Sequence, residues 1–411
     1  MKRVLFAGYD GTDIGQLLPV FAELKNRDIE SIVINNCQLP PAPGSVKDAL
    51  VLDPPLPGSA EPTGLPDVLS SFLSGAEIER LIGRECFDAY VNRRFHAATA
   101  LRCHQSYLDF VSQSLERYKP SAAVICVGEL ESIMAEQSCA EFGIDCCSFV
   151  PQFFEYNMLE WFEVRSELQA YLVAGAHGKL RLIEKGASPD RVIVTGNPMF
   201  DRYAQRRKKS AWYSGWIGRP KEQRKVILYT MQGVRQNWCL LDLLKAYLTK
   251  RPECALLVRP HPASPLPPNF AMGGYFADRT SVDTGSIEDA LETATVLVTL
   301  SSMTVLDALI FTVPAITFKS DFMPHTLPFA GNGDSIGVGD QQQLESALDS
   351  LLFDQKFRKR WLDQHQKSGS RYVSTIDGKA AERIAAFLAL FPDQRATGSN
   401  DRRASTAACD G

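Results

Sequence analysis

Short apolar runs alternate with longer stretches of helical periodicity along most of the chain, and this alternation limits the possible folds more than any other feature. The runs at residues 3–7, 31–35 and 122–127 illustrate it, because each is apolar nearly throughout and not only at every second position. A strand that is apolar on both faces is typical of a parallel sheet covered by helices on both sides. The alternation therefore predicts the α/β class.

The alternation occurs in two blocks, which predicts two domains of similar size. A length of 411 residues agrees with two or three domains. In the first block we expect strands at residues 3–7, 31–35, 122–127, 145–150, 169–173 and 192–195. In the second block we expect strands at residues 225–229, 255–259, 296–300 and 315–319.

Helical periodicity fills most of the chain between these strands. We expect helices at residues 17–25, 76–118, 132–142, 240–250, 287–293, 305–311, 342–353 and 379–390. Ser286 and Asp289 are spaced as a capping box at the start of one of these helices. Residues 38–66 are rich in proline and glycine and are expected to form a long loop.

A change of composition near residue 203 separates the two blocks. We expect an N-terminal α/β domain, a linker, a C-terminal α/β domain, a last helix and a disordered tail, at residues 1–202, 203–224, 225–377, 378–392 and 393–411. Residues 206–225 contain eight Lys and Arg residues, one Glu and three large aromatic residues. A solvated linker is the first interpretation of this stretch, docking on an anionic membrane the second, and nucleic-acid binding a distant third.

Composition and charge exclude several classes of protein. Hydrophobic residues make up 45% and charged residues 22%, which is typical of a globular chain and not of a disordered one. The net charge of −4 gives no general attraction for nucleic acid. No apolar run approaches the roughly 18 residues of a membrane helix, and the first run is too short for a signal peptide. The ten cysteines contain no Cys-x-x-Cys pair, so reduced buried thiols are expected.

The segment Arg259-Pro260-His261-Pro262 is the strongest candidate for a binding site. An apolar strand delivers an arginine and a histidine to its carboxyl end, and two prolines stiffen the turn that holds them. A guanidinium offers a planar fork to phosphate oxygens, and an imidazole can donate one more hydrogen bond. We therefore favour phosphate binding over a histidine that only caps a loop.

A second candidate follows the next strand, where Ser301-Ser302-Met303-Thr304 precedes a helix. Small hydroxyl residues and free backbone N–H groups at a helix start are typical of an anion site. Ser302 would be the N-cap if the helix starts there, and Thr304 with Asp307 offers a further capping box. Ordinary capping competes with phosphate binding, and the nearby Arg259 favours phosphate. Asp307 would then lie within reach of a ribose hydroxyl.

Four carboxylates follow strands of the first block. Asp10 and Asp13 follow the first strand, and Glu129 and Glu131 follow the third. They are candidates for a general base that removes a proton from an acceptor hydroxyl. The alternative for each is helix capping or exposure to solvent. The turn after the first strand lacks Gly-x-Gly-x-x-Gly spacing, so it predicts no dinucleotide site.

Other catalytic patterns are absent or out of context. The chain has no Asp-x-Asp pair and no His-Glu-x-x-His motif, so the sequence predicts no metal site. Residues 333–337 match Gly-x-Ser-x-Gly, but they lie in a glycine-rich loop and not at a strand-to-helix elbow.

Four motifs follow one another in a recognisable order. They are Gly196-Asn197-Pro198 with Asp201, Arg259-Pro260-His261-Pro262, Ser301-Ser302-Met303-Thr304 with Asp307, and residues 377–384. This series resembles the bacterial surface-polysaccharide transferases of the GT-B superfamily. That group includes capsule and lipopolysaccharide glycosyltransferases and CDP-glycerol glycerophosphotransferases, and the UDP-N-acetylglucosamine 2-epimerases are further relatives. The resemblance covers about residues 170–390.

The resemblance implies a GT-B fold, in which two Rossmann-like, doubly wound domains face a cleft. The first domain would bind the acceptor, and the second would hold the nucleotide donor without a metal. Arg259 and His261 would bind the donor phosphates, and the hydroxyl residues Ser301, Ser302 and Thr304 would form a phosphate turn. The last helix would cross back to the first domain.

The resemblance also bears on the ribose and on the catalytic base. Asp307 stands where many relatives have an acidic residue for the ribose. Many relatives have Gln-His-Gly where this chain has Pro151-Gln152-Phe153. This departure shifts the expected catalytic base from a histidine to the carboxylates of the first block, with Asp13 or Glu129 preferred.

The sequence therefore predicts a metal-independent glycosyltransferase of surface polysaccharide biosynthesis. It would need no cofactor beyond a nucleotide-sugar donor and would act on a glycan or lipid-linked acceptor. One alternative is a UDP-N-acetylglucosamine 2-epimerase, and another is a non-catalytic scaffold that binds a nucleotide sugar. We expect a cytoplasmic protein without a nucleic-acid partner, and residues 206–225 are the candidate for peripheral contact with the inner membrane face.

Overall fold

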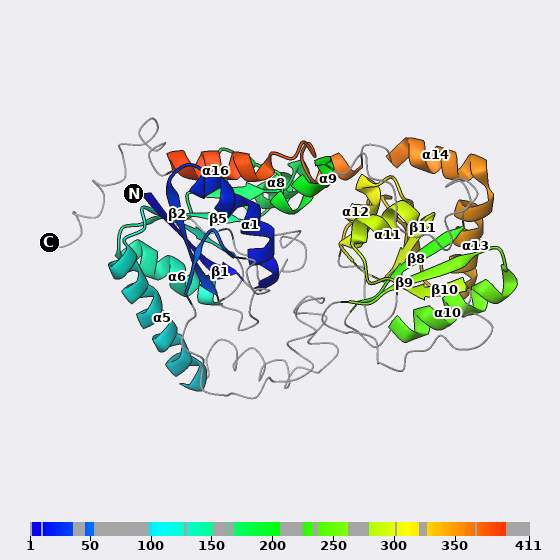
Figure 1. Ribbon diagram of the computed structural model, residues 1–411, viewed down its shortest axis with the longest axis horizontal. Coiled ribbons are helices and arrows are strands. Elements are labelled where there is room, and N and C mark those ends of the chain that lie inside the picture. Colours follow the sequence, from blue (N-terminus) through cyan, green and yellow to red (C-terminus); the bar gives the residue numbers. More distant parts are fainter. Residues whose placement is uncertain are drawn as a thin grey trace.

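The computed structural model describes residues 2–9, 11–35, 46–52, 98–126, 130–150, 164, 168–205, 225–232, 237–261, 279–300, 302–319, 327–365 and 368–391. These residues form two parallel sheets of seven and six strands, one in each half of the chain (Figure 1). The predicted α/β class and the two Rossmann-like domains are confirmed.

The first sheet has the strand order β3-β2-β1-β4-β5-β6-β7. Its strands are β1 (Lys2–Tyr9), β2 (Ile29–Asn35), β3 (Leu50–Leu52), β4 (Ala122–Ile125), β5 (Asp145–Phe149), β6 (Ala170–Val173) and β7 (Val192–Val194). The helices described in this half are α1 (Gly11–Lys25), α5 (Ala98–Tyr118), α6 (Leu130–Glu141), α8 (Ala176–Glu184), the 3-10 helix η1 (Pro198–Phe200) and α9 (Asp201–Gln205).

The second sheet has the strand order β10-β9-β8-β11-β12-β13. Its strands are β8 (Val226–Thr230), β9 (Ala255–Arg259), β10 (Thr280–Val282), β11 (Val296–Thr299), β12 (Ala315–Phe318) and β13 (Ile336–Val338). The helices described in this half are α10 (Asn237–Lys250), α11 (Ile287–Thr293), α12 (Thr304–Ile310), α13 (Gln341–Phe353), α14 (Gln355–His365), α15 (Gly369–Tyr372) and α16 (Ala380–Leu390).

Both faces of the first sheet are buried. Leu5 and Ala7 of β1 share a core with α5 and α6, whereas Val4 and Phe6 share a core with α1 and α16. All four side chains are at most 1% exposed. Because successive residues of a strand point to opposite faces, a strand between two helical layers is apolar at every position.

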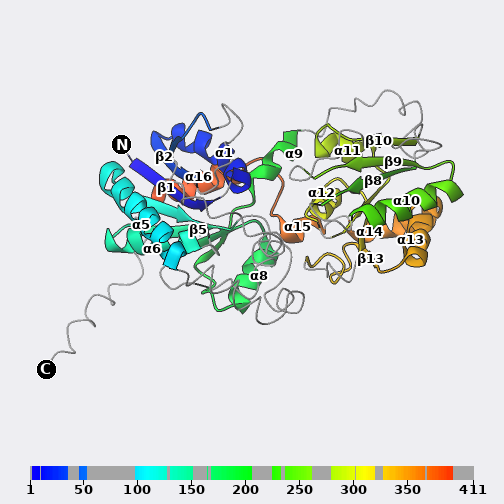
Figure 2. The same cartoon turned by 90° about the horizontal axis from the view of Figure 1, so that it is seen from below.

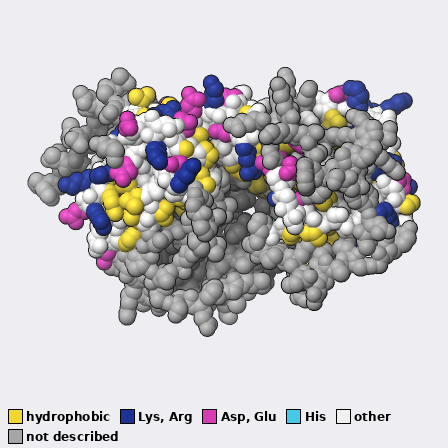
Figure 3. All heavy atoms as spheres, in the orientation of Figure 1, with side chains coloured by type: hydrophobic (Ala, Val, Ile, Leu, Met, Phe, Trp, Pro, Cys, Tyr) yellow, Lys and Arg dark blue, Asp and Glu magenta, His cyan; other side chains and the backbone are white. Residues whose placement is uncertain are grey.

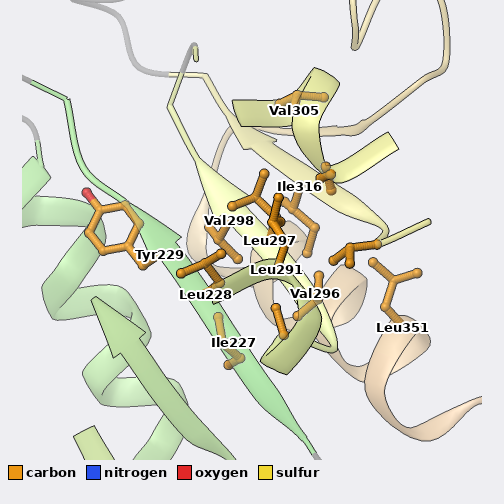
Figure 4. Close-up of a cluster of buried hydrophobic side chains, with 14 of the residues drawn as sticks. Ile227, Leu228, Tyr229, Leu291, Val296, Leu297, Val298, Val305, Ile316 and Leu351 are labelled. Atoms are coloured by element: carbon orange, nitrogen blue, oxygen red, sulfur yellow. The ribbon is translucent and has the colours of Figure 1, made fainter. Parts of the chain in front are cut away.

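The second domain has one continuous core. Figure 4 shows Ile227 of β8, Val298 of β11 and Ile316 of β12 beside Leu291 of α11 and Leu351 of α13. All five side chains are fully buried. Burying a side chain of this size contributes roughly 1.5–3 kcal/mol, so this layer accounts for much of the domain's stability.

Several elements differ from their prediction. The strand β3 lies inside the predicted loop at residues 38–66, so that prediction is wrong for Leu50–Leu52. β10 and β13 were not predicted either, because polar residues or a glycine interrupt these three-residue strands. Helix α14 was not expected, because Trp361 is its one buried residue and the apolar stripe is narrow.

Two helix starts also bear on the predictions. Helix α1 begins at Gly11, well before the expected residue 17, because the glycines of its first two turns are typical of loops. Ser286 caps α11 as predicted, since its Oγ accepts the N–H of Asp289 at 3.2 Å. The early part of the predicted helix at residues 76–118, residues 206–224 and the tail lie outside the described residues.

Helix α16 comes from the end of the chain but packs on the first domain, against α1 (Figure 1). Its Ile384 and Leu388 are fully buried in the core that α1 covers. The carboxylate of Asp201 accepts the backbone N–H groups of Ala380 and Ala381, both at 2.9 Å. Asp201 therefore caps α16 and joins the outgoing chain at α9 to the returning chain.

The glycine motif before α9 also serves this junction. Gly196 has a φ of +85°, and a Cβ on it would lie 2.9 Å from the Cβ of Ala380. The Nε of Arg383 donates to the carbonyl oxygen of Thr195 at 2.7 Å, and its Nη1 pairs with Asp377 at 2.8 Å. The first and last of the four motifs found in the sequence therefore contact each other.

A second contact between the halves lies at the start of α8. The N–H of Ser374 donates to the carbonyl oxygen of Ala174 at 2.8 Å, and the ring of His177 stacks on Tyr372 with centroids 5.2 Å apart. Figure 2 places α15, which ends at Tyr372, between the two lobes. Gly175 follows Ala174, and because it has no side chain its backbone can approach the backbone of Tyr372 closely.

We expect Gly175→Ala to weaken this contact. Its Cβ would lie 2.3 Å from the carbonyl oxygen of Tyr372, and a backbone atom cannot turn aside as a side chain can. The free energy of unfolding should fall by about 3 kcal/mol, the upper range for overpacking. Urea unfolding measures this change.

Gly15→Ala is the matched control, because a Cβ on Gly15 would meet nothing within 4 Å and Gly15 is exposed within α1. Alanine in an exposed helix position should stabilise the protein by roughly 0.5–1 kcal/mol. Equal effects of the two substitutions would contradict the close approach at Gly175.

Candidate active site

The order of strands reverses once in each sheet, and this reversal marks where a ligand binds in such folds. In the second sheet it lies between β8 and β11, which pair directly. In the first sheet it lies between β1 and β4, which also pair directly. We therefore expect the ligand site at the carboxyl ends of these strands.

Hydroxyl side chains gather at the carboxyl edge of the second sheet. The Oγ1 atoms of Thr230 at the end of β8 and Thr304 at the start of α12 are 2.9 Å apart. The Oγ1 of Thr299, at the end of β11, donates to the carbonyl oxygen of Thr230 at 3.0 Å. Thr230 and Thr299 were not predicted from the sequence, although each is a polar residue that ends an apolar strand.

Arg259 ends β9, the strand next to β8. Its Nη1 donates to the carboxylate of Asp283 and, at 2.8 Å, to the carbonyl oxygen of Gly285. The side chain of Asp283 is fully buried, whereas that of Arg259 remains 26% exposed. One edge of the guanidinium is therefore fixed by the protein, and the fork is held in one orientation.

His261 lies two residues beyond Arg259 at the same edge. The ring is half-buried, and burial holds the pKa of the imidazole below its usual value. His261 is therefore neutral at pH 7, where it can donate one hydrogen bond and accept another. This state agrees with the predicted role as a hydrogen-bond donor.

The turn before α12 differs from the predicted caps. Met303 occupies the N-cap position without a side-chain bond, so Ser302 is not the N-cap. The Oγ of Ser302 still accepts the N–H of Thr304 at 3.2 Å and its hydroxyl at 3.1 Å. Ser301 lies outside the described residues, and the predicted phosphate contacts of all three residues stay predictions.

Asp307 has a partner that the sequence did not suggest. Its Oδ1 accepts the hydroxyl of Tyr203 at 2.5 Å. The alternative of a capping box with Thr304 does not hold, because Met303 and not Thr304 is the N-cap of α12. Asp307 is 7% exposed, and burial raises the pKa of its carboxyl from the ordinary 3.8 to about 6. Tyr203 and Arg202 oppose this shift, because both favour the ionised carboxylate. The predicted contact with a ribose stays a prediction.

Two of the four candidate bases belong to helices that start at the edge of the first sheet. Asp13 is in the first turn of α1, which follows β1, and Glu131 is in the first turn of α6, which follows β4. The fold therefore brings these two helix starts to the point where the strand order reverses. Asp10 and Glu129 lie outside the described residues.

The carboxyl edges of both sheets lie beside the places where the chain passes from one domain to the other. In the first domain, Ala174 follows β6 and contacts Ser374, and Thr195 follows β7 and contacts Arg383. In the second domain, Asp307 lies in the helix that follows β11 and contacts α9. Figure 2 shows α9 between the lobes. The starts of α1 and α6 and the strand-end hydroxyls thus belong to the two edges that border one junction.

The described residues also bear on membrane and metal partners. No helix among them is long and apolar enough to cross a membrane. Within the same residues, no group of three or more His, Cys, Asp or Glu side chains could hold a metal ion. On the face shown in Figure 3, the described basic and acidic side chains are intermingled. Metal independence and membrane contact stay predictions.

Comparisons with solved structures give the same fold along nearly the whole chain. S. aureus MnaA solved with UDP has a TM-score of 0.59 and 15% identity, covering 96% of this chain and 97% of that one. A UDP-N-acetylglucosamine 2-epimerase from Rickettsia bellii gives 0.59 and 15%, with 96% and 98% covered. The glycotransferase of kitacinnamycin gives 0.59 and 14%, with 94% and 98% covered.

These likenesses establish the fold, which is GT-B, with two Rossmann-like domains. No family model and no curated protein matches the sequence. Because the identities are near 15%, the place of the candidate site follows from the strand order and the strand-end residues of this chain.

The pKa of Asp307 leads to a test by pH. The folded protein holds this proton more tightly than the unfolded chain, so the wild type gains stability as pH falls from about 6 towards 4. Asp307→Asn removes the ionisation, and asparagine can still accept the hydroxyl of Tyr203. The stability of the variant relative to wild type should therefore be higher at pH 7.5 than at pH 4.5. Across the whole range between the two pKa values, the free energy of unfolding should change by about 3 kcal/mol.

Urea unfolding of wild type and Asp307→Asn at both pH values measures this difference. Taking the difference between the two proteins cancels the other titrating groups, including Asp201, whose carboxyl pKa burial also raises. A stability difference that does not change with pH would show that Asp307 has an ordinary pKa.

Proposed function

We propose that the chain is a metal-independent glycosyltransferase that moves a sugar from a nucleotide donor to a glycan or lipid-linked acceptor. One observation carries the proposal: an oriented arginine and a group of hydroxyl side chains converge where the strand order of the C-terminal sheet reverses. Nucleotides bind at this point in Rossmann-like sheets. The UDP in the S. aureus MnaA structure supports a nucleotide ligand for this fold.

Sugar transfer needs groups that stabilise the departing nucleotide diphosphate. The bond between the anomeric carbon and the diphosphate breaks, and the diphosphate oxygen gains negative charge. In our proposal Arg259 supplies positive charge, and neutral His261 and the hydroxyl of Ser302 supply hydrogen-bond donors. Thr304 holds Ser302 in place through its N–H and its hydroxyl. Asp283 fixes one side of the guanidinium, which limits the reorganisation needed when the charge develops.

The acceptor oxygen must lose its proton as it attacks the anomeric carbon. We assign this step to one of the four carboxylates predicted from the sequence, with Asp13 and Glu129 as the leading candidates and Asp10 and Glu131 as the others. A carboxylate that is ionised at neutral pH can take this proton. The acceptor would then bind to the first domain, opposite the donor.

Nucleotide binding is the first test of the proposal. UDP, GDP, CDP, CMP and dTDP would be compared by thermal shift, with and without EDTA. One nucleotide should raise the melting temperature regardless of EDTA, since a ligand at 100 times its Kd adds about 2.7 kcal/mol. A shift lost in EDTA would contradict metal independence, and no shift from any nucleotide would contradict the donor site.

Arg259→Lys tests the site within the same assay. Lysine keeps a positive charge beside Asp283 but removes the planar fork, so nucleotide affinity should fall about tenfold, or 1.4 kcal/mol. Arg251→Lys is the matched control, because Arg251 also pairs with an aspartate, Asp349, within the second domain. Equal nucleotide affinity in Arg259→Lys and wild type would exclude Arg259 from the phosphate site.

Epimerisation is a second candidate, favoured by several solved structures of the same fold that are named as UDP-N-acetylglucosamine 2-epimerases. An epimerase converts its nucleotide sugar without an acceptor, whereas a transferase needs one for productive transfer. We expect no 2-epimer when the protein is incubated with UDP-N-acetylglucosamine alone and followed by proton NMR. Accumulation of the 2-epimer would show that the protein is an epimerase and not a transferase.

A further inference from the structure

Helix α9 is attached to the first domain at one end. It follows β7 and η1 directly, and the carboxylate of its first residue, Asp201, caps α16 through two backbone N–H groups. A Cβ on Gly378, just before α16, would lie 3.2 Å from the Cβ of Ala204. Because α16 packs on α1, α9 is held by the first domain and by the returning chain.

The same short helix reaches into the second domain with two consecutive side chains. The Nε of Arg202 lies 2.8 Å from Oε1 of Glu288 in α11. The hydroxyl of Tyr203 donates to Asp307 in α12 at 2.5 Å. The ring of Tyr203 also packs edge-on against Phe311, with centroids 5.2 Å apart. We call this set of contacts the α9 clamp.

Both acids of the clamp are buried in the second domain. Glu288 is 3% exposed and Asp307 is 7% exposed. A buried carboxylate costs several kcal/mol unless it is paired and hydrogen-bonded. Arg202 and Tyr203 therefore satisfy acids of the second domain with groups from a helix that the first domain holds, which makes the clamp specific for one arrangement of the two domains.

The clamp lies close to the strand-end hydroxyls. Asp307 is one helical turn after Thr304, whose hydroxyl contacts both Thr230 and Ser302. Arg259 is also near enough to act electrostatically on Asp307. The first turn of α12 therefore connects the clamp to the residues proposed to hold the donor.

We propose that Arg202 and Tyr203 are positioning residues, which hold the proposed donor site of the second domain in register with the edge of the first domain. The register of the two domains depends on the fold alone, whereas the effect on turnover rests on the proposed function. Donor and acceptor atoms must be held about 3–3.5 Å apart in the reactive geometry, and a misplacement of about 1 Å can cost a factor of about 100 in rate. Loosening the clamp should therefore lower kcat while leaving nucleotide affinity nearly unchanged.

The chain offers matched controls for both side chains. Tyr203→Phe removes the bond to Asp307, Arg202→Met removes the ion pair with Glu288, and each also removes the 3.4 Å bond from Arg202 to the Tyr203 hydroxyl. The phenylalanine keeps the packing on Phe311. Tyr247→Phe removes the same type of bond, from a buried tyrosine to Asp349 at 2.8 Å, but wholly within the second domain. Arg251→Met likewise breaks an internal arginine–aspartate pair. Arg202→Lys tests rescue by a conservative change.

Three measurements decide the proposal. Fluorophores attached through unnatural amino acids at the exposed residues Gln137 in α6 and Gln364 in α14 report the distance between domains by single-molecule energy transfer. Titration with UDP reports nucleotide affinity. Turnover with a donor and an acceptor reports kcat and KM. Circular dichroism establishes that each variant is folded.

We expect Tyr203→Phe and Arg202→Met to broaden the distance distribution and to lower kcat at least tenfold. UDP affinity should stay within twofold of wild type, the two controls should keep a narrow distribution, and Arg202→Lys should recover part of the loss. An unchanged distribution in both variants would overturn the proposal. A large loss of UDP affinity with an unchanged distance would also overturn it, because Tyr203 or Arg202 would then contact the ligand.

Failure of the proposed function gives a different result. If wild type binds no nucleotide and turns over no donor, the proposed function is wrong, while the distance distributions still decide whether the clamp sets the arrangement of the domains. If wild type binds UDP and the clamp variants keep both wild-type distance and kcat, the proposed function stands and the positioning role does not.

Discussion

The first sheet needs a helical layer on each face, and the rest of the architecture depends on how that need is met. Its strands are apolar on both sides, and the second face is completed by α16, from the far end of the chain. The chain must therefore cross between the domains twice. Asp201 joins the two crossings by capping α16. Because α16 must return to cover the first sheet, the second domain begins after the first crossing and ends before the second.

The crossings border the edges of both sheets where chemistry is expected. The strand order reverses between β1 and β4 and again between β8 and β11. Helices that follow three of these strands bear Asp13, Glu131, Thr304 and Asp307, and Ser302 lies just before one of them, α12. Arg259 is held at the same edge of the second sheet by Asp283, whose side chain is fully buried. The residues that join the domains and the residues proposed to bind the donor are therefore neighbours, and α12 belongs to both groups.

Much of the fold follows from the sequence, and the failures have definite causes. The strands β1, β4, β9 and β11 were predicted because each is a continuous apolar run, and α11 because Ser286 caps it. The strands β10 and β13 were missed because polar residues or a glycine interrupt them, and β3 because it lies within a proline-rich stretch. In the candidate site, Arg259 and His261 were predicted from a local motif. Thr230 was missed because a single hydroxyl at a strand end has no motif around it. Its position as a polar residue at the end of an apolar strand was visible in the sequence.

The sequence by itself determined the alternation of strands and helices and the polar residues at strand ends, because these depend on neighbours within a few positions. Only the tertiary structure decided which distant groups meet. Tyr203 and Asp307 are 104 positions apart, and neither carries a local signal for the other. Asp201 and Ala380 are 179 positions apart. A buried carboxylate takes the partner that packing brings to it, and that choice depends on the whole fold.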